Sequence, residues 1–419
     1  MCVFAAASAA APVAEARSGN RHAAKSHKAV ARPKAKAVAA AATEPAAADS
    51  LPVSSSPPPP PKLLSRPEVL ASDGDRLARV GRHIIVGFHD WEEVAALVAK
   101  RAIGGIFITD HNVRRKSAAD IKNKIEALQE VRRQQGLPPL IVAADQEGGN
   151  VSRLSPPLKH QATLGHMLEH VEHDDDRRPI VEAYAREQAA ELSRIGVTMN
   201  FGPVVDLKLD IKNRDDGETR LRQRAISADP YTVAKVAGWY CAGLAERNIM
   251  CTLKHFPGLG RVARDTHVVS GEVATSEGTL ELNDWVPFRR LSRQPNVATM
   301  IGHVRLNAID KTTPASFSRV IIGSLLRQNW EYEGLIVTDD FSMGAVTKNK
   351  MGIGRAAVES INAGADFVLV SYIEKHLDEI LSALIAADAA GDLDTTAEQT
   401  SAQRIERIVT GAASGAKQP

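Results

Sequence analysis

The sequence predicts a single closed (β/α)8 barrel of the TIM-barrel type, on three observations. From about residue 80, short β-branched runs alternate with longer amphipathic segments, the pattern of parallel βα units. Eight such runs can be found, and polar residues gather at their carboxyl ends. Roughly 350 residues of the 419-residue chain follow the first segment, which is ample for one barrel of about 250 residues, although two smaller domains would also fit.

The first segment differs in composition from the rest. Residues 1–61 are mostly Ala, Pro, Ser and Lys and end in Pro57–Pro61, so we expect a disordered linker that buries too little apolar surface to fold. An A-x-A-like site at Ala14–Glu15–Ala16 suggests an export signal, but the usual basic start is missing. Plain Ala-rich disorder is an equal alternative, so the bacterial envelope is favoured only slightly over the cytoplasm.

The barrel is expected over residues 62–412, with a flexible tail at 413–419. The expected strands are HIIVGF (83–88), GGIFIT (104–109), LIVAAD (140–145), TMNFGPV (198–204), CTLKHF (251–256), VATMIGHV (297–304), GLIVTDD (334–340) and FVLVS (367–371). Helical patterns follow most of them; WEEVAALVAKRA, for example, places Val94, Leu97 and Val98 on one face. A doubly wound open sheet is the competing fold, but no Gly-x-Gly-x-x-Gly follows the first strand.

Charge and cysteine content exclude several classes of protein. The formal net charge of +2 argues against a nucleic-acid binder, which normally carries a strong basic excess. Cys2, Cys241 and Cys251 form no CxxC and no zinc spacing. We expect two of them to be small core residues without a disulfide framework, which leaves the redox compartment open. No apolar run approaches the roughly 18 residues of a membrane span.

Polar side chains close five of the eight predicted strands. They are Asp145, Asp206, Lys254 with His255, His303, and Asp339 with Asp340. In a barrel the carboxyl ends of the strands carry the active site, because the βα loops converge there while the interior is packed. A single charged residue at a strand end is usually a cap. Five such ends indicate an enzyme.

Common hydrolase motifs are missing from the sequence. It contains neither a HxH pair at the first strand, nor HExxH, nor GxSxG. His255, His267 and His303 could bind a metal in principle, but their spacing predicts no site, so we expect neither a metal nor a cofactor. The remaining carboxylates, arginines and the Lys–His pair suit a sugar ring and its hydroxyls.

Glycosidic cleavage needs a carboxylate beside the anomeric carbon and a proton donor at the leaving oxygen. Asp339, at the end of GLIVTDD, fits the first role, with Asp340 as its rival. Strand alternation sends the two side chains to opposite sides, so only one can face the barrel mouth. Capping of the next helix is the alternative role for this pair, and for Asp340 above all.

The loop KHFPGLGRVARDTH supplies a candidate proton donor. Pro257, Gly258 and Gly260 permit a turned backbone, and Asp265 and His267 lie two residues apart further along. A histidine with an ordinary pKa near 6.5 can give and take a proton near neutral pH. A neighbouring carboxylate would fix its tautomer. Alone, the Asp-Thr-His motif is weak evidence.

Several segments together resemble the family-3 glycoside hydrolases, most closely their single-domain β-N-acetylglucosaminidase branch. The segments are DQEGGNVSRL (145–154), VTMNFGPVVDL (197–207), RAISADP (224–230), KHFPGLG…DTH (254–267), HVRLNAID…PASFS (303–318), EGLIVTDDFSMGAV (333–346) and INAGADFVLVS (361–371). They follow the family's order over roughly residues 80–390. The resemblance therefore implies a barrel and a glycosidase.

The resemblance also implies roles for individual residues. Asp339 would form a covalent glycosyl–enzyme intermediate, and Asp265 with His267 would serve as acid/base. The residues implied to bind the sugar are Asp145, Arg153, Arg224, Lys254 and His255. Two positions depart from the family: Leu259 replaces a histidine after KHFPG, and Asn150 replaces a frequent arginine after DQEGG. Neither is a proposed proton carrier.

The expected function is retaining exo-hydrolysis of terminal β-linked N-acetylglucosamine, from peptidoglycan fragments or chito-oligosaccharides, by a monomer. Phosphorolysis on the same site is an alternative, because a neutral histidine would not repel a phosphate dianion. A broader-specificity β-glycosidase is a second. A catalytically silent sugar-binding module is a third, but it would be expected to lack the nucleophile or the dyad.

Overall fold

The computed structural model describes residues 62–212, 217–373 and 375–414. The predictions made for residues 1–61, both the disordered linker and the export signal, lie outside these ranges. The last described helix ends at Ser414, so most of the expected tail also lies outside them.

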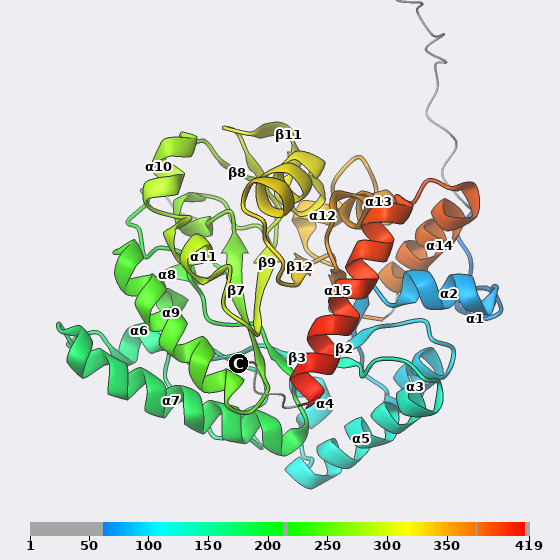
Figure 1. Cartoon of the computed structure of the whole chain (residues 1–419), viewed down its shortest axis with the longest axis horizontal. Helices are drawn as coiled ribbons and strands as arrows, with labels where there is room; N and C mark the ends of the chain where they lie inside the picture. Colours follow the sequence, from blue (N-terminus) through cyan, green and yellow to red (C-terminus); the bar gives the residue numbers. More distant parts are fainter. Residues whose placement is uncertain (1–61, 213–216, 374, 415–419) are drawn as a thin grey trace, which may run out of the picture. The chain divides into compact units, whose positions relative to one another are not determined.

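Eight parallel strands close into a barrel in the order β1-β13-β12-β9-β7-β6-β3-β2 (Figure 1). The strands are β1 (Ile84–Gly87), β2 (Gly105–Ile108), β3 (Ile141–Ala144), β6 (Met199–Asn200), β7 (Met250–Phe256), β9 (Val297–Ile301), β12 (Ile336–Asp340) and β13 (Phe367–Val370). Each of the eight predicted strands corresponds to one of them. The predicted (β/α)8 barrel is confirmed, and because the sheet closes, the doubly wound alternative is excluded.

Helices surround the barrel, as Figure 1 shows for α7, α9 and α5. The α-helices are α1 (Arg66–Leu70), α2 (Gly74–Gly81), α3 (Trp91–Ala99), α4 (Asp110–Val113), α5 (Ala118–Gln134), α6 (Leu164–Met167), α7 (Asp174–Ile195), α8 (Leu221–Arg224), α9 (Pro230–Ala245), α10 (Glu277–Leu282), α11 (Val286–Leu291), α12 (Gly344–Thr347), α13 (Ile353–Ala363), α14 (Lys375–Ala390) and α15 (Thr395–Ser414). Two 3-10 turns, η1 (Leu259–Arg261) and η2 (Ala315–Phe317), and a π-helix, η3 (Val320–Asn329), complete the set. None of the helices in the described ranges is long and apolar enough to cross a membrane.

The βα loops carry two small accessory sheets. One is the hairpin β4 (Gln146–Gly148) with β5 (Val151–Ser152), directly after β3. The other joins β8 (Gly271–Val273), β10 (Val304–Leu306) and β11 (Asp310–Pro314), from the loops after β7 and β9. Both therefore lie on the side of the barrel where the strands end.

Strand alternation divides the core into two layers. In β1, Ile84 and Val86 pack in the layer between strands and helices, whereas Ile85 belongs to the cluster inside the barrel. Ile405 and Val409 of α15 also belong to the inner cluster. Since the interior is filled by side chains, the barrel is a packed core, and chemistry is confined to its loop-bearing end.

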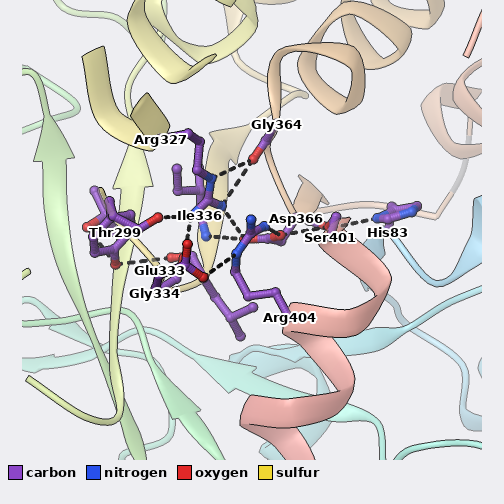
Figure 2. A network of polar contacts seen from close by, with 12 residues as sticks. His83, Thr299, Arg327, Glu333, Gly334, Ile336, Gly364, Asp366, Ser401 and Arg404 are labelled. Atoms are coloured by element: carbon purple, nitrogen blue, oxygen red, sulfur yellow. Dashed lines mark hydrogen bonds and ion pairs between the residues drawn. The ribbon is translucent and has the colours of Figure 1, made fainter. Parts of the chain in front are cut away.

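A buried carboxylate fixes α15 to the other end of the barrel, where the strands begin (Figure 2). Asp366, directly before β13, is fully buried and accepts hydrogen bonds from Arg404 (2.6 Å) and Ser401 (2.7 Å) of α15. Its second oxygen accepts from Arg327 of η3 and from the backbone N–H of Ile336, each at 2.7 Å. Burial works to raise the pKa of Asp366, but the two arginines lower it below its ordinary value.

We expect Asp366→Asn to lower the free energy of unfolding by about 3–5 kcal/mol, because it removes the negative charge that two largely buried arginines share. Urea denaturation followed by circular dichroism measures the change. Asp75→Asn is the matched control, since Asp75 pairs with Arg101 at a largely exposed position, its side chain 84% accessible, and should change stability little. Equal effects of the two substitutions would contradict a structural role for this cluster.

One expectation about the cysteines is wrong. Cys241 of α9 and Cys251 of β7 are buried, as expected of core residues, but they are joined by a disulfide with their Cα atoms 5.4 Å apart. They lie ten positions apart in the sequence, and only the packing of α9 against β7 brings them together. No spacing motif could therefore have predicted the disulfide. The bond fixes α9 to β7, the strand that carries Lys254 and His255.

Candidate active site

Four charged side chains form a compact cluster at the carboxyl ends of β3 and β7. Lys254, buried at the end of β7, donates to Asp145 (2.7 Å) and pairs with Glu147 of the β4–β5 hairpin (2.6 Å). Arg224 at the end of α8 donates through Nε and Nη2 to the two oxygens of Glu147, at 2.8 and 2.7 Å. The bidentate geometry fixes the guanidinium in one orientation. Three of the five residues implied to bind sugar therefore lie together.

Glu147 and Lys254 of this cluster keep their charges despite their burial. Burial alone would raise the pKa of Glu147, but Arg224 and Lys254 lower it to about 2. Burial would likewise lower the pKa of Lys254, yet Asp145 and Glu147 raise it above its ordinary value. The side chain of Asp145 remains 24% accessible. A fixed carboxylate beside a fixed ammonium is suited to hydrogen bonding with the hydroxyl groups of a sugar.

His255 is oriented by a buried carboxylate. Asp206 accepts hydrogen bonds from Nδ1 of His255 at 2.6 Å, from its backbone N–H at 3.0 Å and from the backbone N–H of Leu259 at 2.5 Å. Because Nδ1 donates to Asp206, the other ring nitrogen, Nε2, is left for a ligand. Leu259, the departure from the family pattern, is buried and takes part through its backbone.

Asp265 and His267 form a hydrogen-bonded pair, as the dyad requires. Asp265 is buried, and its Oδ1 accepts from Nδ1 of His267 at 3.0 Å, while the His267 side chain remains 45% accessible. The same carboxylate accepts from the backbone N–H groups of Glu218 (2.8 Å) and Thr219 (2.9 Å) and from the Thr219 hydroxyl (2.7 Å). Burial works to raise the pKa of Asp265, but these hydrogen bonds lower it to about 2. Because Nδ1 of His267 faces Asp265, the other ring nitrogen, Nε2, is the one left for a ligand.

The segment before α8 connects the dyad to the charged cluster. Thr219 contacts Asp265 through its hydroxyl, and its carbonyl oxygen accepts from Nη1 of Arg224 at 2.9 Å. Thr219 Oγ1 also lies 3.2 Å from Nδ1 of His267. One short stretch of backbone therefore positions both the candidate dyad and the arginine that holds Glu147.

We expect Thr219→Val to reduce kcat about 10-fold on substrates with poor leaving groups and to leave KM nearly unchanged. The substitution removes a hydrogen bond to a charged group, while the backbone N–H donors of Glu218, Thr219 and His267 to Asp265 remain. Steady-state kinetics measure the split, with Thr396→Val at an exposed position of α15 as the control. An equal loss on substrates with good leaving groups, or a change in KM alone, would contradict a role in positioning Asp265 and His267.

Asp339 lies among three histidines. Burial works to raise its pKa, but the neighbouring histidines, His255 foremost, and the backbone N–H of Asp340, which donates to Oδ1 at 2.9 Å, lower it below the ordinary value. The carboxylate is therefore ionised at neutral pH, as a nucleophile must be. Side chains from the ends of β7, β9 and β12 and from the loop after β7 therefore meet around Asp339.

Asp340 has a different environment. Its Oδ1 accepts from the backbone N–H groups of Ser342 and Ser371, each at 2.9 Å, so it binds together the ends of β12 and β13. It does not cap the next helix, the alternative role raised from the sequence, because the N-cap residue of α12 is Met343.

His303 follows β9 and contacts the same strand end. Its Nε2 lies 3.0 Å from the carbonyl oxygen of Asp340 and its Nδ1 lies 2.8 Å from the Ser316 hydroxyl. A carbonyl only accepts, so Nε2 carries the proton and Nδ1 accepts from Ser316. Burial lowers the pKa of His303, which favours this neutral form.

Arg153 is not part of the charged cluster formed by the other candidate residues. Its backbone N–H donates to the carbonyl of Asp145 at 3.1 Å, but its side chain is exposed and forms no ion pair with the described residues. Asn150 donates to Gln223 of α8 at 3.2 Å. Its amide thus ties the β4–β5 hairpin to the segment that carries Arg224.

Glu147 and Thr219 were not predicted from the sequence, and His303 was given no role in the chemistry. Glu147 could have been predicted, because it lies two residues after Asp145 in an extended hairpin, so both side chains point to the same face of that hairpin. No sequence pattern could have identified Thr219, because its partners Asp265 and His267 are distant in sequence. Within residues 62–212, 217–373 and 375–414, no group of three or more His, Cys, Asp or Glu side chains could hold a metal ion.

Comparison with known families identifies the family of the chain. The profile of the glycosyl hydrolase family 3 N terminal domain matches residues 77–408. The chain belongs to glycosyl hydrolase family 3. It is therefore a glycosidase, and the resemblance inferred from its motifs is confirmed.

Relatives of this family-3 glycosidase bear consistent names. It is 32% identical over 342 residues to the beta-hexosaminidase LpqI of Mycobacterium tuberculosis, covering 80% of this chain and 82% of LpqI. It is 30% identical over 326 residues to a beta-hexosaminidase of Idiomarina loihiensis, covering 78% of this chain and 91% of that one.

Solved structures agree with the sequence comparisons. The family-3 β-N-acetylglucosaminidase of Paenibacillus sp. FPU-7 superposes with a TM-score of 0.73 at 26% identity, over 82% of this chain and 64% of that one. The LpqI structure superposes with a TM-score of 0.69 at 27% identity, over 86% and 99%.

Proposed function

We propose that this family-3 glycosidase is a retaining exo-β-N-acetylglucosaminidase, acting on terminal β-linked N-acetylglucosamine of peptidoglycan fragments or chito-oligosaccharides. The environment of Asp339 carries the proposal, because an ionised carboxylate lies among three histidines. The charged cluster at the ends of β3 and β7 is suited to sugar hydroxyls. The names of the relatives support the 2-acetamido sugar, since they are hexosaminidases and β-N-acetylglucosaminidases.

The reaction divides into two steps. In the first, the Asp339 carboxylate attacks the anomeric carbon while His267 gives its Nε2 proton to the departing oxygen, which leaves as an alcohol. In the second, His267 takes a proton from water, the water oxygen attacks the anomeric carbon, and Asp339 is released as a carboxylate. Asp265 holds the Nδ1 side of His267 throughout.

The proposal is tested by comparing β-N-acetylglucosaminides with β-glucosides that carry the same aryl leaving group. A strong preference for the acetamido sugar is expected, whereas similar rates would favour a broader-specificity β-glycosidase. Adding inorganic phosphate distinguishes phosphorolysis, because formation of a sugar 1-phosphate in place of free sugar would show that phosphate is the acceptor.

We expect the first-formed sugar to be the β-anomer, because two successive displacements at the anomeric carbon restore its configuration. Proton NMR recorded within minutes of mixing, before mutarotation, detects the anomeric signal. If the α-anomer appeared first, the enzyme would be inverting and Asp339 could not act as a covalent nucleophile.

We also propose that the enzyme works in an oxidising compartment, such as the bacterial envelope. The disulfide between Cys241 and Cys251 supports this, because such bonds persist in exported proteins and are rare in the cytoplasm.

A further inference from the structure

Three exposed aromatic side chains lie together at the rim of the barrel mouth, outside the site described above. His89 follows β1, His111 lies in α4 directly after β2, and Tyr372 follows β13. The rings of His89 and Tyr372 stack with centroids 5.6 Å apart and planes 17° apart, and His111 meets His89 edge to face at 4.7 Å. These three residues are called the rim aromatics below.

The backbone that carries two of the rim aromatics is fixed. The buried side chain of Asn112, next to His111, donates to the carbonyl of Phe88, next to His89, at 2.7 Å. Asp90 then caps α3 by accepting from Glu92 at 3.0 Å. The rings are thus presented by anchored loops, which reduces the ordering cost of binding a ligand.

The rim aromatics have the features of a carbohydrate-binding surface. All three are exposed, Tyr372 to 45%, and their polar atoms form no hydrogen bond with other residues in the described ranges. An aromatic face packs against the C–H face of a pyranose, while phenol and imidazole edges pair with hydroxyl groups. Binding sites combine such apolar faces with a few polar groups.

The rim aromatics follow three successive strands beside the strand of Asp339, the candidate nucleophile. In the closed barrel, β2, β1, β13 and β12 are neighbours in that order, so the rim aromatics occupy the arc next to the strand of Asp339. The backbone N–H of Ser371, directly before Tyr372, donates to Asp340 at 2.9 Å. The charged cluster, by contrast, comes from the loops after β3 and β6 and from the end of β7.

We propose that the rim aromatics bind the aglycone sugar, the ring attached to the oxygen that leaves. Tyr372 supplies the stacking face, and His89 and His111 support it and offer hydrogen bonds. The proposal rests on the proposed function and deepens it, because it makes an oligosaccharide, with a second pyranose beyond the scissile bond, the preferred substrate class.

Two substrates with equally poor leaving groups separate aglycone binding from chemistry. They are methyl β-N-acetylglucosaminide, which has no second ring, and the β-1,4-linked disaccharide of N-acetylglucosamine. We expect Tyr372→Ala to lower kcat/KM about 10-fold on the disaccharide, a loss typical of one stacking contact, and less than 2-fold on the methyl glycoside. Tyr372→Phe, which keeps the ring, should retain most of the activity.

The control is Tyr231→Ala on α9, because Tyr231 has the same 45% exposure but packs beside Arg290. Equal losses on both substrates, or none on either, would overturn the proposal. If the unmodified enzyme hydrolysed neither substrate, the proposed function would fail instead. In that case, saturation-transfer NMR with the disaccharide tests binding at the rim aromatics separately from catalysis. The reducing-end ring should receive magnetisation from the unmodified protein but not from Tyr372→Ala. Absence of that transfer in the unmodified protein would refute the rim site.

Discussion

Asp339→Asn should reduce kcat for N-acetylglucosaminide hydrolysis on the order of 10⁴-fold or more, because it keeps the shape of the side chain and removes the attacking charge. The pKa of Asp339 is already held below its ordinary value by the surrounding histidines, so the unmodified enzyme has a full negative charge to lose. Steady-state kinetics on an activated aryl glycoside measure the change, with circular dichroism to confirm the fold.

Asp340→Asn is the matched control, one residue away and chemically identical. An asparagine keeps an acceptor oxygen for the backbone N–H groups of Ser342 and Ser371, so a loss of about 10-fold or less is expected. If Asp340→Asn proved the more damaging substitution, the roles of the two aspartates would have to be exchanged.

His267→Ala should have the second largest effect, roughly 10²–10⁴-fold on glycosides whose leaving group is an alcohol. Without the imidazole the departing alkoxide receives no proton, whereas an activated phenolate needs little help. Plotting log kcat/KM against leaving-group pKa should therefore give a steeper slope for His267→Ala than for the unmodified enzyme.

Asp265→Asn serves as the companion variant. It leaves the imidazole in place but weakens the acceptor at Nδ1, so its effect on the same substrates should be smaller, roughly 10- to 1000-fold. An unchanged slope in His267→Ala would make His267 a structural loop residue, and another proton donor would have to be sought.

The barrel could be predicted because its signals are local. Each strand is a short apolar run, and strand alternation alone separates Ile85, inside the barrel, from Ile84 and Val86, outside it. The polar strand ends could be predicted for the same reason, since parallel strands in a barrel bring their carboxyl ends to one face.

Contacts between residues that lie far apart along the chain could not be predicted from the sequence. The three hydrogen bonds from Glu218 and Thr219 to Asp265 join two loops that follow different strands. The disulfide between Cys241 and Cys251 depends in the same way on helix–strand packing. Periodicity and spacing describe only near neighbours, so such pairs appear only once the barrel is closed.

Covalent trapping tests the central claim, that Asp339 is the nucleophile, most directly. A 5-fluoro N-acetylglucosaminyl fluoride should accumulate as a glycosyl–enzyme, because the ring fluorine slows both steps by destabilising the oxocarbenium-like transition state while fluoride leaves readily. Mass spectrometry of a peptic digest is predicted to find one added sugar residue on the peptide that contains Asp339, and none in Asp339→Asn. An adduct on another residue, or inactivation without any adduct, would contradict the account.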